Sequence, residues 1–348
     1  MQARGTQHSR QAAPDPARAH ATLRFAFGVT VALVASELLQ WVPTFLAPAL
    51  VAVLLVNVPV RPPLKLAIGL LAIVSAAALI ALFLSAALLR SPLILFGVAA
   101  VVVFRTLYAI AEGRSRVAAL FLLICVTAIP VIALESPSIA SAFAYALVRA
   151  TCLAIVIAWT SYLLWPRVRP PRPAAKVAPL PPNWRLKSAL LGTAVLTPLM
   201  LLYLMFGLTH ALPVLIATAM IVMNLDFRSG RMQAVALVAG NVAGGIVALV
   251  VFLLLAMQSS IVSLALLTAL AALAFGWRIS AGDPMAPVVL VACNATLIVL
   301  SSSLVSDQGT FAVWVTRLTQ FVIAGAFAVG MMALIWPRNA QGTAQAPT

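Results

Sequence analysis

Three arginines lie inside stretches of sequence that are otherwise almost entirely apolar: Arg105, Arg149 and Arg317. A charge at the centre of a membrane-spanning helix costs at least ~2.5 kcal/mol and therefore needs compensation. Acidic side chains do not supply it, because Glu37 is the one Asp or Glu that lies clearly within an apolar stretch. Ionisable groups inside a membrane mark ion and substrate paths, and a guanidinium matches a carboxylate with two parallel hydrogen bonds. The sequence therefore indicates a wet path for small anions.

A second interpretation is that these arginines bond exposed backbone carbonyls or extend along their helices to the lipid headgroups. We favour the anion path for Arg149, which lies ~15 Å from the start of its stretch at ~1.5 Å per residue. We favour it also for Arg317, which holds the matching place in the second half of the chain. For Arg105, nearer the expected cytoplasmic end of its stretch, both interpretations stay open.

An asparagine followed four residues later by an arginine occurs in both halves of the chain, as Asn57 with Arg61 and as Asn224 with Arg228. Each pair ends an unusually short apolar stretch. Short hydrophobic segments at corresponding places of two halves are typical of broken helices beside a substrate site. The other interpretation is a basic cytoplasmic turn with a capping asparagine, and the sequence leaves both open.

Two further side chains are candidates for proton coupling. Glu37 and His210 both lie toward the expected outer face, in the first stretches or loops of their halves. A carboxylate and an imidazole there can take up and release protons during an export cycle. We interpret His210 rather as an interfacial residue at the start of a helix, which leaves Glu37 as the stronger candidate.

The composition indicates an all-α protein that crosses a membrane many times. Of 348 residues, 64% are hydrophobic and 8% are charged, and the mean hydropathy is +1.11. Soluble domains carry about 25% charged residues, so this much apolar surface cannot be hidden in a water-soluble core. The net charge of +15 does not indicate nucleic-acid binding, because the basic residues are spread over short loops between apolar stretches.

Breaks at Pro, Gly and Ser divide the chain into twelve apolar stretches, each expected to be a membrane-spanning helix in the lipid bilayer. The expected helices are 23–41, 44–60, 65–89, 92–111, 116–134 and 139–165, then 186–206, 210–225, 231–257, 259–277, 284–304 and 310–336. A disordered tail is expected at 1–22 and a second tail at 337–348. The repeated prolines of 166–185 rule out a continuous helix and indicate a water-exposed linker between a first unit at 23–165 and a second at 186–336.

Landmarks of the first unit recur in the second at a nearly constant interval. The matched pairs are Asn57 and Asn224, Gly113 and Gly282, Arg149 and Arg317, and Pro166 and Pro337. We therefore predict two six-helix repeats that form a covalent pseudo-dimer. Because six is even, both copies start on the same side, and a rotation about the membrane normal should relate them.

Basic loop residues indicate the orientation. If the N-terminus is cytoplasmic, nearly all Lys and Arg residues outside the apolar stretches lie inside, and Arg90 is the one basic residue of the outer loops. Cytoplasmic loops carry an excess of Lys and Arg. Both termini and the linker are therefore expected in the cytoplasm.

Several catalytic motifs are missing from the sequence. It contains no G-x-x-x-x-G-K-[ST], no H-E-x-x-H, no G-x-S-x-G and no aspartate-rich pair able to hold Mg²⁺ and a diphosphate. We expect neither an enzyme nor a bound cofactor or metal, and a membrane-embedded lipid enzyme ranks last among the alternatives.

Two six-helix apolar units, a basic turn after the second stretch, and final stretches with Arg149 and Arg317 together resemble the fusaric-acid-resistance (FUSC) superfamily. Aromatic acid exporters belong to it, and plant aluminium-activated malate channels are distantly similar. The closest local match runs from Arg317 and Gln320 through Gly325 to Trp336-Pro337. The resemblance implies proton-driven export of aromatic carboxylates from bacteria across the inner membrane, often with a periplasmic membrane-fusion adaptor and an outer-membrane channel.

The chain departs from this pattern in two places. The linker stands where longer members carry a large cytoplasmic domain, and Arg149 lacks the later glycine that follows Arg317. The chain thus resembles a short, membrane-only branch.

Two other transport classes stay open. A passive anion channel would use the same arginines. A drug/proton antiporter of the major facilitator class would share the two six-helix halves, and Asp226-Phe-Arg228-Ser-Gly230-Arg231 superficially resembles its D-R-x-G-R loop, one residue out of step.

Overall fold

The computed structural model of the chain describes residues 16–58, 61–166, 180–208, 212–305 and 310–335, which form α-helices joined by turns. The helices are α1 (Pro16–Leu38), α2 (Leu46–Asn57), α3 (Leu64–Leu88), α4 (Pro92–Ala111), α5 (Arg116–Glu135), α6 (Pro137–Leu164), α7 (Pro182–Phe206), α8 (Leu212–Val222), α9 (Phe227–Met257), α10 (Ile261–Ser280), α11 (Ala286–Val305) and α12 (Thr310–Ile335). Ten of them are long and apolar enough to span a membrane. The predicted fold class, an all-α polytopic membrane protein, is confirmed.

The two remaining helices, α2 and α8, are shorter than a bilayer is thick, so neighbouring non-helical residues such as Leu39–Phe45 would have to complete each of these two expected crossings. They contain 12 and 11 residues, which gives ~18 Å and ~17 Å against a hydrocarbon core of ~30 Å. The sequence predicted short segments at these two places, and this is confirmed. Leu39–Phe45, which precedes α2, is a run of turns rather than helix.

Proline residues begin several of the helices. Pro16, Pro92, Pro137 and Pro182 are the first residues of α1, α4, α6 and α7. Proline is suited to the first turn, because its fixed φ is helical and the N–H that it lacks has no partner there anyway. α1 therefore starts within the tail expected at 1–22, and α7 within the linker expected at 166–185.

α9 also begins earlier than expected, because Asp226 caps it. A carboxylate oxygen of Asp226 accepts a hydrogen bond from the backbone N–H of Ser229 at 3.0 Å, which is the usual geometry of a helix N-cap. Arg228, expected in a loop, consequently lies in the first turn of α9.

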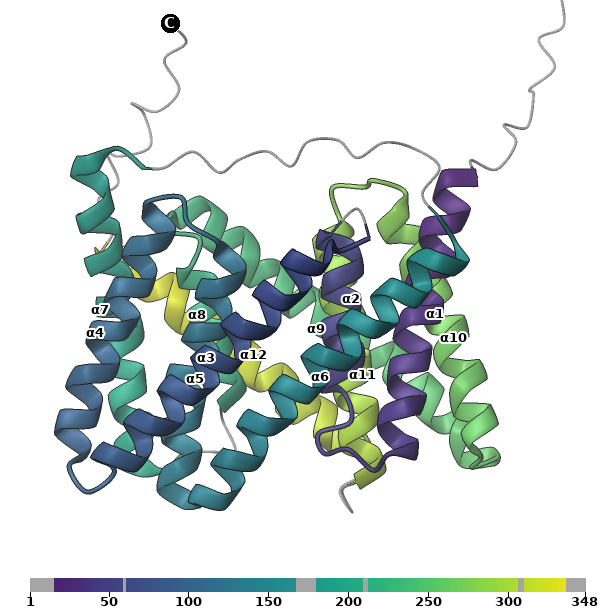
Figure 1. Cartoon of the computed structure of the whole chain (residues 1–348), viewed down its shortest axis with the longest axis horizontal. Coiled ribbons are helices and arrows are strands. Elements are labelled where there is room, and N and C mark those ends of the chain that lie inside the picture. The colour runs from purple at the N-terminus through teal and green to yellow at the C-terminus, as the bar shows by residue number, and fades with distance from the viewer. Residues whose placement is uncertain (1–15, 59–60, 167–179, 209–211, 306–309, 336–348) are drawn as a thin grey trace, which may run out of the picture.

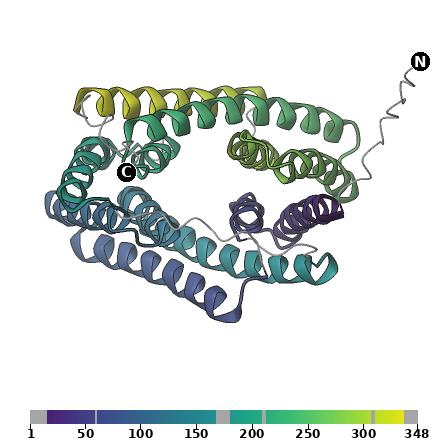
Figure 2. The same cartoon turned by 90° about the horizontal axis from the view of Figure 1, so that it is seen from above.

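Four tilted helices form the long sides of the molecule. α3 and α6 lie along one side and α9 and α12 along the other, and they run obliquely in the side view (Figures 1 and 2). α1 and α10 pack together at one end, and α4 and α7 at the other (Figure 2). The first helix of each half thus packs against the fourth helix of the other half.

The helix contacts of the second half mirror those of the first. α3 packs on α5 and α6 as α9 packs on α11 and α12, and α2 packs on α6 as α8 packs on α12. Across the halves, α1 pairs with α10 as α7 does with α4. A two-fold repeat would produce this pattern, and the rotation that would relate the two halves stays a prediction.

Candidate functional site

A cavity of about 370 Å³ lies between α2, α3, α5 and α6. Its wall consists mainly of Leu and Val side chains, with polar groups from Asn57 of α2, Ser115 before α5 and Thr151 of α6. Cavities of this size with an apolar wall and few polar groups are typical sites for small organic ligands. An aromatic ring would suit this wall, and the polar groups could orient a substituent.

The end of α2 borders this cavity and is anchored to α6. The side-chain amide of Asn57 donates to the carbonyl four residues earlier in α2 at 2.8 Å. The hydroxyl of Tyr162 donates to the carbonyl of Val58 at 2.7 Å, and Nε1 of Trp159 donates to that of Pro62 at 2.9 Å. Val58 and Pro62 both follow α2, so the bonds from Tyr162 and Trp159 hold the residues after α2 against α6. Two of these three donors come from α6, so α6 fixes where α2 ends.

Asn224 occupies the corresponding place after α8. Its amide donates to the carbonyls of Met220 at 3.3 Å and Ile221 at 3.1 Å. Both asparagines therefore act as caps at the ends of their short helices, which was one of the two interpretations of the sequence. Asn57 in addition lines the cavity.

The arginines of these pairs lie at the ends of helices. Arg61 is exposed in the turn between α2 and α3, and Arg228 is exposed in the first turn of α9. Lys65, also exposed, is the second residue of α3. Arg61 and Lys65 therefore bring positive charge close in sequence to the end of α2 that borders the cavity.

Arg149 is held by the connection between α1 and α2. Its guanidinium donates to the carbonyl of Val42 at 3.1 Å and lies 4.6 Å from the ring centroid of Trp41. It also lies 5.4 Å from the ring of Tyr145, one turn earlier in α6. This arrangement matches the carbonyl-bonding interpretation. Because α6 is tilted (Figure 1), distance along the helix overestimates how deep Arg149 lies.

Arg317 is half-buried on α12, where it donates to the side-chain oxygen of Gln320 at 3.4 Å. In the described part of the chain its side chain forms no ion pair, since the one salt bridge there joins Arg114 and Glu112. α12 and α6 lie on opposite long sides of the molecule (Figure 2). None of the described side-chain contacts brings Arg317 and Arg149 together.

Arg105 lines a second, lateral groove of about 680 Å³ between α3, α4 and α5. The sequence analysis singled out Arg105 but not Arg114, which lines the same groove from the turn after α4. The groove and the cavity share Ile73 and Ser115 in their walls. The turn Glu112-Gly-Arg-Ser115 was visible in the sequence, but its position beside Arg105 depends on how α4 and α5 pack.

Glu37 lies in the last turn of α1 and lines a cleft of about 360 Å³ with Gln40, Ser259 and Ser260. One of its carboxyl oxygens is buried and has no hydrogen-bond partner within the described structure. This shielded oxygen keeps Glu37 a candidate for proton coupling. His210 lies outside the described residues.

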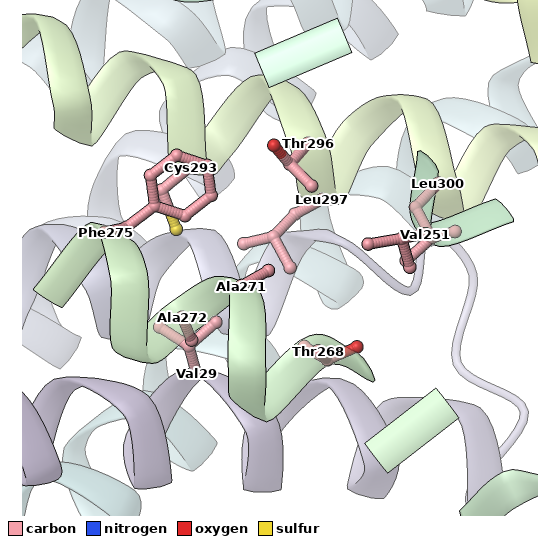
Figure 3. A pocket seen from close by; sticks show the side chains of 10 residues that line it. All are labelled: Val29, Val251, Thr268, Ala271, Ala272, Phe275, Cys293, Thr296, Leu297 and Leu300. Carbon is pink, nitrogen blue, oxygen red and sulfur yellow. The ribbon is translucent and has the colours of Figure 1, made fainter. Parts of the chain in front are cut away.

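A fourth space is a packing void rather than a site. It measures about 10 Å³ between α1, α9, α10 and α11 (Figure 3). Thr268 and Thr296 are among its lining residues, and the other lining side chains are apolar or Cys293 (Figure 3). The Thr296 hydroxyl donates to the backbone carbonyls of Gly244 and Ala292, at 2.9 Å each. A space this small holds about one water molecule, so it cannot accept a substrate.

The first half of the chain is similar to a known protein family. A family model described as "Protein of unknown function (DUF2955)" matches residues 21–160, from α1 into α6. No curated protein and no solved structure matches the chain. The match includes every residue that lines the cavity between α2, α3, α5 and α6. The description of the family names no activity.

Proposed function

We propose that the chain exports small organic anions, foremost aromatic carboxylates, across the bacterial inner membrane. The cavity beside α2 is the observation that carries this function: about 370 Å³, mainly apolar, with Asn57 and Thr151 among its few polar groups. α2 is a short helix that does not span the bilayer without the non-helical residues beside it, and short or broken helices border the substrate sites of secondary transporters. The wall suits an aromatic ring, and the polar groups suit a carboxylate or hydroxyl.

Charge supports anions over cations as substrates. The net charge is +15, and Arg61 and Lys65 follow closely after the end of α2. Positive charge at a low-dielectric cleft raises the local concentration of anions. The resemblance to the FUSC superfamily points to the same substrate class, with proton coupling, for which Glu37 is our candidate. A periplasmic adaptor and an outer-membrane channel would be its partners.

Efflux of a labelled acid tests the function. Cells that lack the protein and cells that express it would be loaded with 4-hydroxybenzoate or fusaric acid, and retention would be followed with and without a protonophore. We expect expressing cells to retain less acid, and the protonophore to abolish the difference. Efflux that survives the protonophore would indicate a passive anion channel. If expressing cells retained as much of each acid as cells that lack the protein, this substrate class would be contradicted.

Reporter fusions test the orientation. Alkaline phosphatase is active only outside the cytoplasm, so we expect a fusion after Ser91, in the turn between α3 and α4, to be active. A fusion after Pro337 should be inactive, because the excess of basic loop residues places the C-terminus inside. Activity after Pro337 would contradict the arrangement with both termini in the cytoplasm.

Arg149 and Arg317 should respond differently to removal of their charge. Arg149→Gln loses the bond to the Val42 carbonyl and the contact with the Trp41 ring, so we expect it to destabilise the fold by ~1–3 kcal/mol. Arg317→Gln should insert normally and lose transport of anions, because its loss removes an attractive charge from the membrane region. Transport would be normalised to inserted protein, with thermal unfolding measured alongside. Loss of insertion in Arg317→Gln would instead give Arg317 a structural role.

A further inference from the structure

The lateral groove between α3, α4 and α5 combines an apolar wall with two guanidiniums. Ile80 and Val101, which line it, are 45% and 60% exposed, so the groove opens to the surroundings of the protein. α3 and α4 lie at the periphery of the helix arrangement (Figure 2). For a membrane-spanning chain, the surroundings at this depth are lipid chains, which therefore fill the apolar part of the groove.

The positive charge is concentrated at one end of the groove. Arg105 lies six residues before the end of α4, ~9 Å along the axis, and a long arginine side chain can extend that far toward the headgroups. Arg114 lies in the turn that follows α4, and both arginines line the groove. The ion pair between Arg114 and Glu112, at 3.2 Å, is exposed. Exposed ion pairs contribute little to stability, so a phosphate can replace Glu112 as the partner of Arg114.

α5 adds to the same positive field. It begins at Arg116, and Ser115, Ala118 and Ala119 of its N-terminal end also line the groove. The N-terminus of a helix carries a partial positive charge from its aligned peptide dipoles. Two guanidiniums and a helix N-terminus thus surround the headgroup end of an apolar groove.

We propose that this groove binds one anionic phospholipid, with its phosphate between Arg105 and Arg114 and an acyl chain against Ile80 and Val101. Basic pockets between membrane helices on the cytoplasmic side bind anionic headgroups. A free anion would satisfy the two arginines but leave the apolar wall uncovered, whereas a phospholipid covers both. The site is separate from the proposed transport function and does not depend on it.

The corresponding turn of the second half has an acidic residue where the first half has Arg114. The turns after α4 and α10 correspond, since Gly113 and Gly282 both adopt positive φ, at 82° and 72°. The residue after the glycine is Arg114 in the first half but Asp283 in the second, where its carboxylate accepts a bond from the N–H of Met285 at 2.9 Å. Because this turn has no counterpart of Arg114, we expect the lipid site in the first half of the chain.

Lipid binding by the full chain tests the site. Native mass spectrometry of the detergent-purified protein would compare the first binding event of phosphatidylglycerol with that of phosphatidylcholine. We expect Arg105→Gln and Arg114→Gln each to weaken phosphatidylglycerol binding about five-fold, and the double variant about 25-fold, with phosphatidylcholine unaffected. The matched control is Arg278→Gln, which removes an exposed charge from the last turn of α10.

A groove-filling variant tests the apolar part. Ala76 is exposed and lines the groove from α3, so Ala76→Trp occupies the space for the acyl chain while both arginines remain. We expect it to weaken phosphatidylglycerol binding at least five-fold. Unchanged phosphatidylglycerol binding in the double arginine variant, or an equal loss in Arg278→Gln, would overturn the site. If Ala76→Trp bound phosphatidylglycerol as tightly as the unaltered protein, the site would also be overturned.

Discussion

Gly244→Val should clearly destabilise the folded protein. Gly244 lies on α9 where α11 approaches most closely, and a Cβ there would overlap the carbonyl of Ala292 and lie 2.8 Å from the Cβ of Ala295. Backbone atoms cannot move aside as a flexible side chain does, so α9 and α11 would have to separate. The hydroxyl of Thr296 donates across this contact to the carbonyl of Gly244 at 2.9 Å, and that bond would be lost too.

The expected cost is large for a single methyl-bearing side chain. Overpacking costs ~1–3 kcal/mol, and small residues are what allow membrane helices to approach each other closely. We expect the apparent melting temperature to fall by roughly 5 °C or more, measured by size-exclusion chromatography of heated, detergent-solubilised protein. Gly330→Val on α12 is the matched control, because a Cβ there meets nothing within 4 Å. Equal melting temperatures for the two variants would contradict the tight α9–α11 contact.

Much of this fold follows from the sequence, because apolar stretches and their breaks are local signals. The short α2 and α8 were expected from the residues that end them, such as Asn57 and Asn224. Helix starts were less predictable, because a proline such as Pro182 can equally end a linker or begin a helix. The pairing of α1 with α10 had no local signal, since it depends on which apolar faces fit together in three dimensions.

The candidate site was less predictable than the fold. Sequence reasoning found Asn57 but not the cavity that it lines, because the other polar groups of its wall, Ser115 and Thr151, lie far from Asn57 in the chain. Sequence reasoning placed Arg149 deep in the membrane from its distance along the helix. In the structure α6 is tilted, and Arg149 donates to the carbonyl of Val42. Arg105 was noticed as a charge, whereas the groove that it shares with Arg114 exists only once α4 and α5 have packed.

Gly69→Trp should abolish transport while leaving the fold intact. Gly69 lines the cavity from α3, and a Cβ there meets nothing within 4 Å. An indole at this position would therefore extend into the cavity of about 370 Å³ rather than into packed helices. Because little space would then remain for a second aromatic ring, we expect efflux of 4-hydroxybenzoate to fall at least ten-fold, which corresponds to ~1.4 kcal/mol.

The matched control is Gly97→Trp, which adds the same side chain to α4 at a place where a Cβ also meets nothing within 4 Å and which is not part of the wall of this cavity. Gly69→Ala provides a second control, because one methyl group leaves most of the cavity free. Both controls should transport like the unaltered protein when efflux is normalised to inserted protein. If Gly69→Trp also transported normally, substrate would have to pass elsewhere, and the cavity beside α2 would lose its proposed role. If all three variants failed alike, the loss would come from changes to helix surfaces in general, and the cavity would gain no support from it.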